Sequence, residues 1–328
     1  MFKKTRRLAG GVLIAAVAVL GLLAHAEAEA QLTKVRVITI PILDTAPLQV
    51  GIAKGFFAEQ GLEVDTAPTA GGAAGLPALA AGQVQITFSN IVSIVLGVKQ
   101  GLEFGIISGG SATGATVPDV AAMVTKKGSS LKTGKDMEGK RIAVNTRNNI
   151  IWLYAREWVL ATGGNPDRVT YVEVPFPQMV DAVRGDQVDA AFVVDPFLAA
   201  GVKSGAVEII AWPYNTVQKR VPVAQYAAMK SFIQANPAVI ERWVRAYNKA
   251  VDWTTQNKGS EEWLKIISGY TRLSPNQLRD ISLPVYDKTL DPAAIEQVVA
   301  LMRKNGMVEG SVDVKGILYK TATDGVKQ

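Results

Sequence analysis

The chain has 328 residues, 48% of them hydrophobic, and its 35 Lys and Arg against 29 Asp and Glu give a formal net charge of +6. A chain longer than about 250 residues usually divides into two domains, and this apolar content supplies ample core for both. Cys is absent and His25 is the only His, which excludes disulfides and, beyond residue 25, Ser-His-Asp or Cys-His catalysis and nearly every structural zinc site.

The first thirty residues have the pattern of a secretory signal peptide. Four cations between residues 3 and 7 precede an uncharged run over 8–24, and the small-residue stretch AHAEAEA follows. We therefore predict a signal peptide over 1–30 and a soluble mature chain from about Gln31. A membrane anchor is the alternative, although a run of ~17 residues is at the short edge of what spans a bilayer. The secretory and twin-arginine export routes both stay open.

The charge that remains after this cleavage is small. Residues 1–30 hold four of the 35 basic and two of the 29 acidic side chains, which leaves 31 − 27 = +4. Because no basic run follows, we expect no nucleic-acid partner. No Cys follows the apolar run, so we expect no lipid attachment there and a freely diffusing protein.

Short apolar runs of β-type residues alternate with helical patterns in the first two thirds of the mature chain. This order is typical of mostly parallel sheets built from β-α-β units. The runs are almost continuously apolar, as expected for strands whose two faces are covered by helices. The first set of expected strands is 35–40, 62–67, 84–89 and 104–109, and the second is 141–145, 169–174, 189–194 and 207–212.

Amphipathic helices dominate the remainder of the chain. Asn236 is the expected cap of a helix that Pro237 opens, and Ser274 begins another with a capping box. A third starts at Asp291 and is closed by Gly306. We interpret the Trp and Met residues along these helices as core packing.

A weak internal repeat links the two sets of strands. ALAAGQVQITFS (78–89) and DAVRGDQVDAAFVV (181–194) share a helix end, a Gly turn, a Gln-Val pair and a strand. The repeat predicts two lobes of similar design.

Three segments resemble the periplasmic binding proteins of the nitrate, sulfonate and taurine uptake family. They are AKGFFAEQGLEV (53–64), TAGGAAGLPALAAGQVQI (69–86) and SLKTGKDMEGKRIAV (130–144), and their order and spacing match along nearly the whole mature chain. Residues 232–253 also resemble the segment that follows the hinge in that family.

The resemblance implies a type II periplasmic-binding fold, in which two α/β lobes close on a ligand. Residues 31–119 and 225–328 would form lobe 1 and residues 120–224 lobe 2, with hinge crossings near 119–125 and 212–225. It also implies a monomeric periplasmic binding protein with no cofactor and no catalysis of its own. Its partners would be a small-molecule ligand, an inner-membrane ABC permease and the ATPase of that permease.

Ligands of open α/β sheets bind on the loops at the carboxyl ends of the strands. Besides Thr69, Ser108, Gly110, Thr146 and Phe176 on these loops, the candidate ligand-binding residues are Asp44, Thr45, Gly71, Gly72, Ser89, Asn90, Ser111, Asn145, Arg147, Asn149, Gln178, Asp195 and Phe197.

The chemistry of these loops favours an anion. Gly71-Gly72 and residues 146–149 lie where helices begin, so free N–H groups and the positive dipole end would face the ligand. Arg147 would add a bidentate contact to a sulfonate or carboxylate, or else lie in solvent or hold the lobe together. Asp44 and Asp195 are either partners for a ligand amine or turn and cap residues.

Two further points stay open at the level of sequence. Phe176 and Phe197 either contact an apolar part of the ligand or pack beneath the loops. Besides a transport receptor, the sequence is compatible with a secreted lyase or hydrolase on the same fold and with a receptor that presents its ligand to a membrane sensor.

Overall fold

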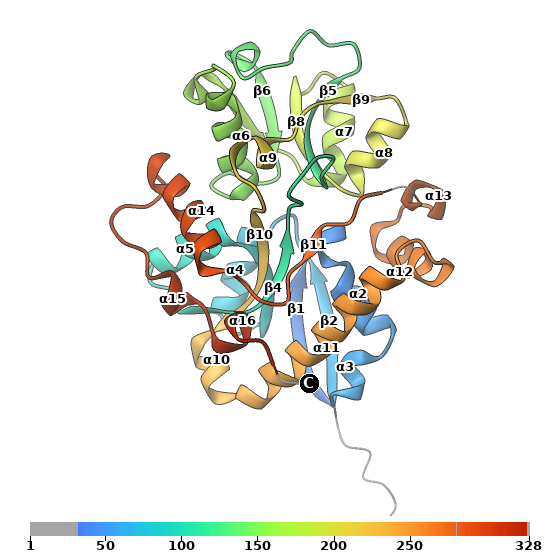
Figure 1. Cartoon of the computed structure of the whole chain (residues 1–328), viewed down its shortest axis with the longest axis vertical. Helices are drawn as coiled ribbons and strands as arrows, with labels where there is room; N and C mark the ends of the chain where they lie inside the picture. The colour runs from blue at the N-terminus through green and yellow to red at the C-terminus, as the bar shows by residue number, and fades with distance from the viewer. Residues whose placement is uncertain (1–31, 280, 327–328) are drawn as a thin grey trace, which may run out of the picture.

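Two β-sheets, each in its own lobe, make up this computed structural model, which describes residues 32–279 and 281–326 (Figure 1). The predicted signal peptide lies outside these residues. The lower sheet of Figure 1 has the strand order β11-β4-β10-β3-β1-β2, and the upper sheet has the order β7-β6-β8-β5-β9. The α/β class is confirmed.

The lobe that contains the first strand, lobe 1, is built from two separate parts of the chain. Its strands are β1 (Thr33–Thr39), β2 (Leu62–Pro68), β3 (Ile86–Asn90), β4 (Phe104–Ala112), β10 (Pro222–Met229) and β11 (Val285–Tyr286). Its helices are η1 (Leu43–Thr45), α2 (Ala46–Ala53), α3 (Phe56–Glu59), α4 (Gly72–Ala80), α5 (Ile91–Lys99), α10 (Lys230–Ala235), α11 (Pro237–Gln256), α12 (Glu261–Thr271), α13 (Pro275–Leu278), α14 (Pro292–Lys304), α15 (Val314–Ile317) and α16 (Lys320–Thr323).

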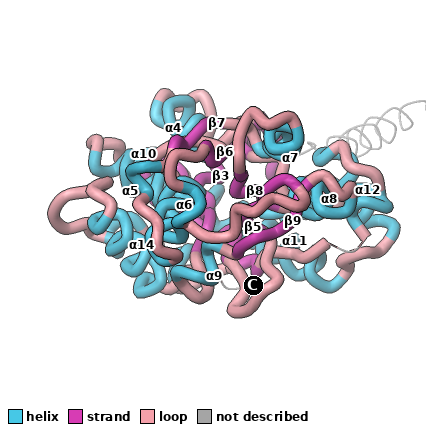
Figure 2. Tube along the Cα trace, turned by 90° about the horizontal axis from the view of Figure 1, so that it is seen from above, coloured by secondary structure: helices cyan, strands magenta, loops and turns pink. Residues whose placement is uncertain are grey.

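Lobe 2 is continuous in the chain. Its strands are β5 (Ala121–Lys126), β6 (Arg141–Val144), β7 (Thr170–Glu173), β8 (Ala190–Val194) and β9 (Val207–Ala211). Its helices are η2 (Lys135–Met137), α6 (Ile150–Ala161), η3 (Pro166–Arg168), α7 (Phe176–Arg184), α8 (Phe197–Lys203) and α9 (Pro213–Val217). Seen from above, the strands lie centrally with helices on either side (Figure 2).

The chain crosses between the lobes twice. It leaves β4 at Ala112 and enters β5 at Ala121, and it returns between the end of β9 at Ala211 and the start of β10 at Pro222. The domain boundaries at 119/120 and 224/225 stay a prediction; the first falls in the outgoing connection and the second inside β10.

The strands that follow the two crossings, β5 and β10, give the sheets mixed pairing. β10 inserts antiparallel between β3 and β4, and β5 inserts antiparallel between β8 and β9. The remaining pairs around β1 and β6 are parallel, as expected from the sequence. The strands expected from the sequence all form, whereas β5, β10 and the two-residue β11 were not among them.

The internal repeat has a structural counterpart. β3 pairs parallel with β1 and antiparallel with β10, and β8 pairs parallel with β6 and antiparallel with β5. Each copy is thus the strand next to a crossing strand, in the middle of its sheet, and is buried along its whole length.

The three helix starts also form. Pro237 opens α11 after Asn236, Asp291 caps α14 through Ala293 N, and Ser274 closes a capping box at α13, which is only one turn long. Trp243 and Met302 are fully buried, which agrees with their interpretation as core residues.

Candidate ligand-binding site

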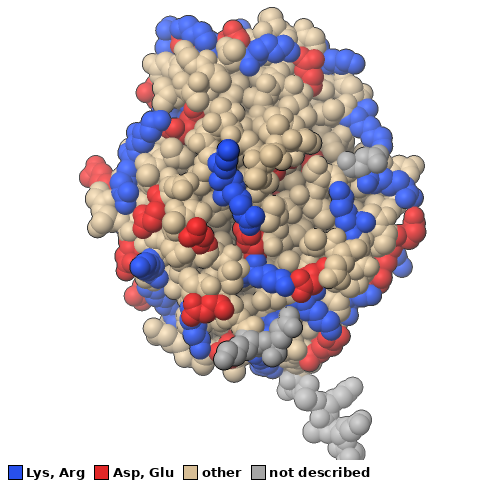
Figure 3. Space-filling model, in the orientation of Figure 1, with Lys and Arg blue, Asp and Glu red and all other residues tan. Residues whose placement is uncertain are grey.

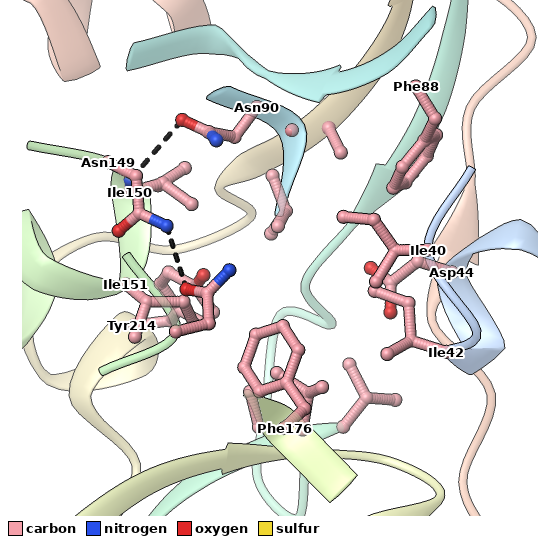
Figure 4. A pocket seen from close by; sticks show the side chains of 17 residues that line it. Ile40, Ile42, Asp44, Phe88, Asn90, Asn149, Ile150, Ile151, Phe176 and Tyr214 are labelled. Atoms are coloured by element: carbon pink, nitrogen blue, oxygen red, sulfur yellow. Dashed lines mark hydrogen bonds between the residues drawn. The ribbon is translucent and has the colours of Figure 1, made fainter. Parts of the chain in front are cut away.

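A cavity of about 40 Å³ lies between the lobes. Lobe 1 contributes the loop after β1, the end of β3 and the first residue of α4, and lobe 2 contributes the starts of α6, α7 and α9 (Figure 4). The outgoing crossing also reaches it at Val120, and the start of β10 reaches it at Val223. The volume is room for a few water-sized groups in this arrangement of the lobes.

The amide of Asn145 faces this cavity with its N–H donors unused. Asn149 caps α6, because its Oδ1 accepts from Trp152 N at 3.0 Å. Its Nδ2 must therefore donate, and it does so to Asn145 Oδ1 at 2.7 Å and Thr146 Oγ1 at 2.8 Å. That fixes the orientation of the Asn145 amide as well. Among the described residues none accepts from Asn145 Nδ2, although the side chain is only 5% exposed.

The first turn of α6 leaves one further donor. Ile150 N donates to Asn90 Oδ1 across the lobes at 3.3 Å, and Trp152 N is taken by the Asn149 cap. Between these two backbone donors along the chain is Ile151 N, which has no acceptor among the described residues. Ile151 is also one of the residues that line the cavity. Free N–H groups at a helix start favour negative charge.

The start of α4 approaches the same cavity from lobe 1, and glycine allows its close packing. A Cβ on Gly72 would lie 2.5 Å from Ser89 Oγ and 2.6 Å from Ser89 Cα, and one on Gly71 would lie 2.8 Å from Asn145 Nδ2. The backbone of lobe 1 therefore lies directly against the Asn145 amide of lobe 2.

The opposite wall carries a carboxyl group. Asp44 lines the cavity from η1 and faces Asn90 and Asn149 across it (Figure 4). Its Oδ1 accepts a 2.5 Å hydrogen bond from Ser111 Oγ, and no other described side chain donates to it. Burial raises the pKa of Asp44 to about 6, against the lowering effect of Ser111. No Lys or Arg is among the described residues that line this cavity.

Apolar side chains form most of the remaining wall. They are Ile40, Ile42, Phe88, Ile150, Ile151, Phe176 and Val194. Tyr214 adds a polar group: its ring packs edge-on against Tyr154, and its buried hydroxyl has no hydrogen-bond partner among the described residues. A buried polar atom without a partner at the wall of a cavity marks a place where a ligand atom can bind.

The structure brings nine of the thirteen predicted residues to the site or directly behind it. Asp44, Gly72, Asn90, Asn145 and Asn149 line the cavity. Directly behind them lie four more, which position the lining residues: Thr45, Gly71, Ser89 and Ser111.

The other four lie elsewhere, Arg147 most clearly. Its guanidinium donates to Tyr171 O from Nε at 3.1 Å and from Nη2 at 2.6 Å, and its backbone N donates to Glu173, so the side chain points away from the cavity. Gln178 is exposed.

Asp195 and Phe197 are also absent from the cavity wall. Asp195 is buried and accepts from Ala199 N at the start of α8, while its carbonyl accepts from Leu43 N of lobe 1. Phe197 lines a larger outer groove of about 620 Å³ between the lobes, together with Tyr270 and Arg272.

Sequence reasoning missed Tyr214, Ile150 and Ile151. The signals for them were present: Tyr214 follows the expected strand 207–212, and the two isoleucines follow the cap Asn149 directly. The rule that ligands bind beyond strand ends and at helix starts therefore covers them.

Charged side chains of both signs mix over the face of the molecule shown in Figure 3. Within residues 32–279 and 281–326, no helix is both long and apolar enough to cross a membrane. The same residues hold no cluster of three or more His, Cys, Asp or Glu that could bind a metal ion.

Two lobes joined by two crossings and enclosing a cavity define a protein of the periplasmic-binding fold. The solved alkanesulfonate-binding protein SsuA of Xanthomonas axonopodis pv. citri, bound to MOPS, has this fold with a TM-score of 0.75 at 14% identity, over 88% of this chain and 98% of that one. The sequence profile of the NMT1/THI5-like family matches residues 43–259, and the chain belongs to that family.

Two curated relatives carry names that state a ligand. The nitrate/nitrite binding protein NrtA of Nostoc sp. is 24% identical over 253 residues, which are 72% of this chain and 57% of the relative. The bicarbonate-binding protein CmpA of Synechococcus elongatus is 23% identical over 273 residues, 70% of this chain and 56% of the relative. The chain thus spans a little over half the length of these relatives.

Proposed function

We propose that this protein is the solute-binding component of an ABC importer and that it captures a small solute with an anionic oxygen-bearing group between its lobes. The observation that supports this most directly is the donor side of the cavity. The Asn145 amide, with Nδ2 free of any acceptor among the described residues, lines one small cavity together with Ile151 of α6 and Gly72 at the start of α4. An anionic oxygen would satisfy groups from both lobes at once and so favour the closed arrangement.

The relatives support the same proposal. Proteins named for nitrate, bicarbonate and alkanesulfonate binding share the fold or the family, and all three ligands are oxyanions. In this chain the anion is held by amides and helix starts rather than by Arg147, whose guanidinium is occupied by Tyr171 O. An inner-membrane permease and its ATPase would be the partners, and the signal peptide expected over 1–30 would bring the protein to the periplasm.

The first test is a search for the solute. We expect native mass spectrometry of the purified protein to show a co-purified small molecule. Melting with nitrate, bicarbonate, methanesulfonate or acetate should show stabilisation, about 2.7 kcal/mol at 100 times the dissociation constant.

The matched variant for this test is Asn145→Asp, which keeps the shape of the amide but places a negative charge where the anion binds. We expect it to remove the stabilisation while the protein still melts cooperatively. If no solute is found, and if neither these anions nor the amino acids glycine and β-alanine raise the melting temperature, the proposal is wrong. Catalytic consumption of a bound solute would also contradict it.

A further inference from the structure

The cavity has a second polar end that an oxyanion alone does not use. Asp44 projects from lobe 1 into the space opposite the amides (Figure 4), and it is 5% exposed. Ser111 is the one described side chain that donates to it, and no Lys or Arg is among the described residues that line the cavity. An anion that filled the donor side would lie across a small cavity from this carboxylate without any cation between them.

We propose that the solute is dipolar and that Asp44 is the residue that selects it, by accepting a hydrogen bond from a protonated amine at the end remote from the anionic group. This inference rests on the proposed function and names the class of its ligand. The sequence left two roles open for Asp44, a partner for a ligand amine or a turn or cap residue, and this inference assigns it the first.

Three features of the wall agree with such a solute. Donors lie at one end, at Asn145 and Ile151 N, and the acceptor lies at the other. Apolar side chains, among them Ile42 and Phe176, line the space between them and match a short hydrocarbon link. The unpartnered hydroxyl of Tyr214 can accept from the same amine or donate to the anion.

The volume sets the size of the solute. About 40 Å³ holds a few non-hydrogen atoms in this arrangement, so the probes are small. Glycine and acetate form one matched pair, and β-alanine and propionate form another. Within each pair the anionic group is constant and only the second member lacks the amine. Nitrate and methanesulfonate serve as further donor-free anions.

Titration calorimetry on the full mature protein with these probes is the experiment. We expect the amino member of at least one pair to bind about 10- to 100-fold more tightly than its donor-free partner, the factor that a hydrogen bond to a charged group contributes. Equal or tighter binding of the donor-free members overturns the inference but leaves the solute-binding function in place. Absence of binding by both amino members also overturns it.

Asp44→Asn is the decisive variant, because it keeps the shape of the side chain and removes its charge. It should abolish the preference for the amino member while the donor-free anions bind as well as before or better. Asp65→Asn, an exposed carboxylate on β2, is the matched control and should keep the preference. A preference that survives Asp44→Asn contradicts the assignment. If Asp44→Asn does not fold, the comparison of pairs on the unmodified protein decides.

Discussion

At the scale of single residues, the carboxyl groups of Asp44, Asp119 and Asp195 are buried. Burial raises the pKa of Asp44 to about 6 and that of Asp195 to about 7, and it also raises the pKa of Asp119. The charge of Asp119 raises the pKa of each of the other two further, and Lys258 partly offsets the effect on Asp195. These groups lie at the cavity and at the contact between the lobes, where a charge is costly without a partner.

These raised pKa values fix how the stability of the ligand-free protein depends on pH. A carboxyl group with a higher pKa in the folded than in the unfolded protein binds its proton more strongly when the protein is folded. The contribution of this group to the free energy of unfolding is complete below the unfolded pKa, near 4, and is lost as the pH rises through the folded pKa. We therefore expect the free energy of unfolding to fall between pH 5 and pH 8, by roughly 1 to 3 kcal/mol for each of Asp44 and Asp195.

Urea unfolding at the two pH values measures this difference. The only His is His25, so no histidine of residues 32–328 titrates in the same range. Asp195→Asn should reduce the difference, whereas Asp65→Asn should leave it unchanged. A free energy of unfolding that is the same or higher at pH 8 contradicts the prediction.

Arg147 and Asn145 show what sequence could and could not place. Both follow β6 closely and both were candidates from the sequence, which left open whether Arg147 binds the anion, lies in solvent or holds the lobe together. The direction of each side chain depends on the neighbouring strand β7, whose Tyr171 O and Glu173 hold Arg147 on the outer side of the loop. Loop position was predictable from the sequence, but orientation depends on a partner strand 24 residues away.

At the scale of secondary-structure elements, the cap of α6 links stability and binding. Asn149 satisfies Trp152 N and, through its other atom, orients the Asn145 amide toward the cavity. Ser260 caps α12 in the same way through Trp263 N, but α12 lies in lobe 1 and contributes nothing to the cavity wall. The two caps therefore form a matched pair that separates the two effects.

We predict that Asn149→Ala and Ser260→Ala each lower the free energy of unfolding by about 1 kcal/mol, the usual cost of a lost N-cap. Only Asn149→Ala should also weaken ligand binding, because it frees the Asn145 amide to rotate. Chemical unfolding and calorimetry with the solute identified by mass spectrometry measure the two quantities. Equal affinities for the two variants would show that the cap has no part in binding.

The elements that the sequence missed have a common cause. β5 and β10 follow the two crossings, and most of β5 and the first part of β10 fall in the ranges 119–125 and 212–225 that the resemblance assigned to the hinge. Their place in the sheets is decided by long-range pairing, β5 with β8 and β10 with both β3 and β4. Strand formation of this kind depends on tertiary context more than on local preference.

At the scale of the whole molecule, the described arrangement is a closed one. Lobe 1 contacts lobe 2 through Leu43 N to Asp195 O, through Ile150 N to Asn90 Oδ1, and through Lys203 Nζ to Asn276 O at 2.9 Å. Lining residues such as Asn149 are buried, 1% exposed, so a solute cannot reach them without separation of the lobes. Entry and release therefore require hinge motion at the two crossings.

The last prediction is that ligand shifts the population toward this closed arrangement. It must bind the closed form more tightly than the open one, since equal affinity for both would change no population. Because the chain has no Cys, cysteines introduced at the exposed positions Lys140 in lobe 2 and Asn276 in α13 of lobe 1 are the only sites for a pair of spin labels. The distance between these labels should be broadly distributed without ligand and become shorter and narrower when ligand saturates the protein. A second pair within lobe 2, at the exposed positions Lys127 and Lys140, should not change, because each lobe moves as a rigid body. Tight binding with an unchanged distance between the lobes would mean that the solute is captured by a preformed cavity, and the closing mechanism would be wrong even though the fold is right.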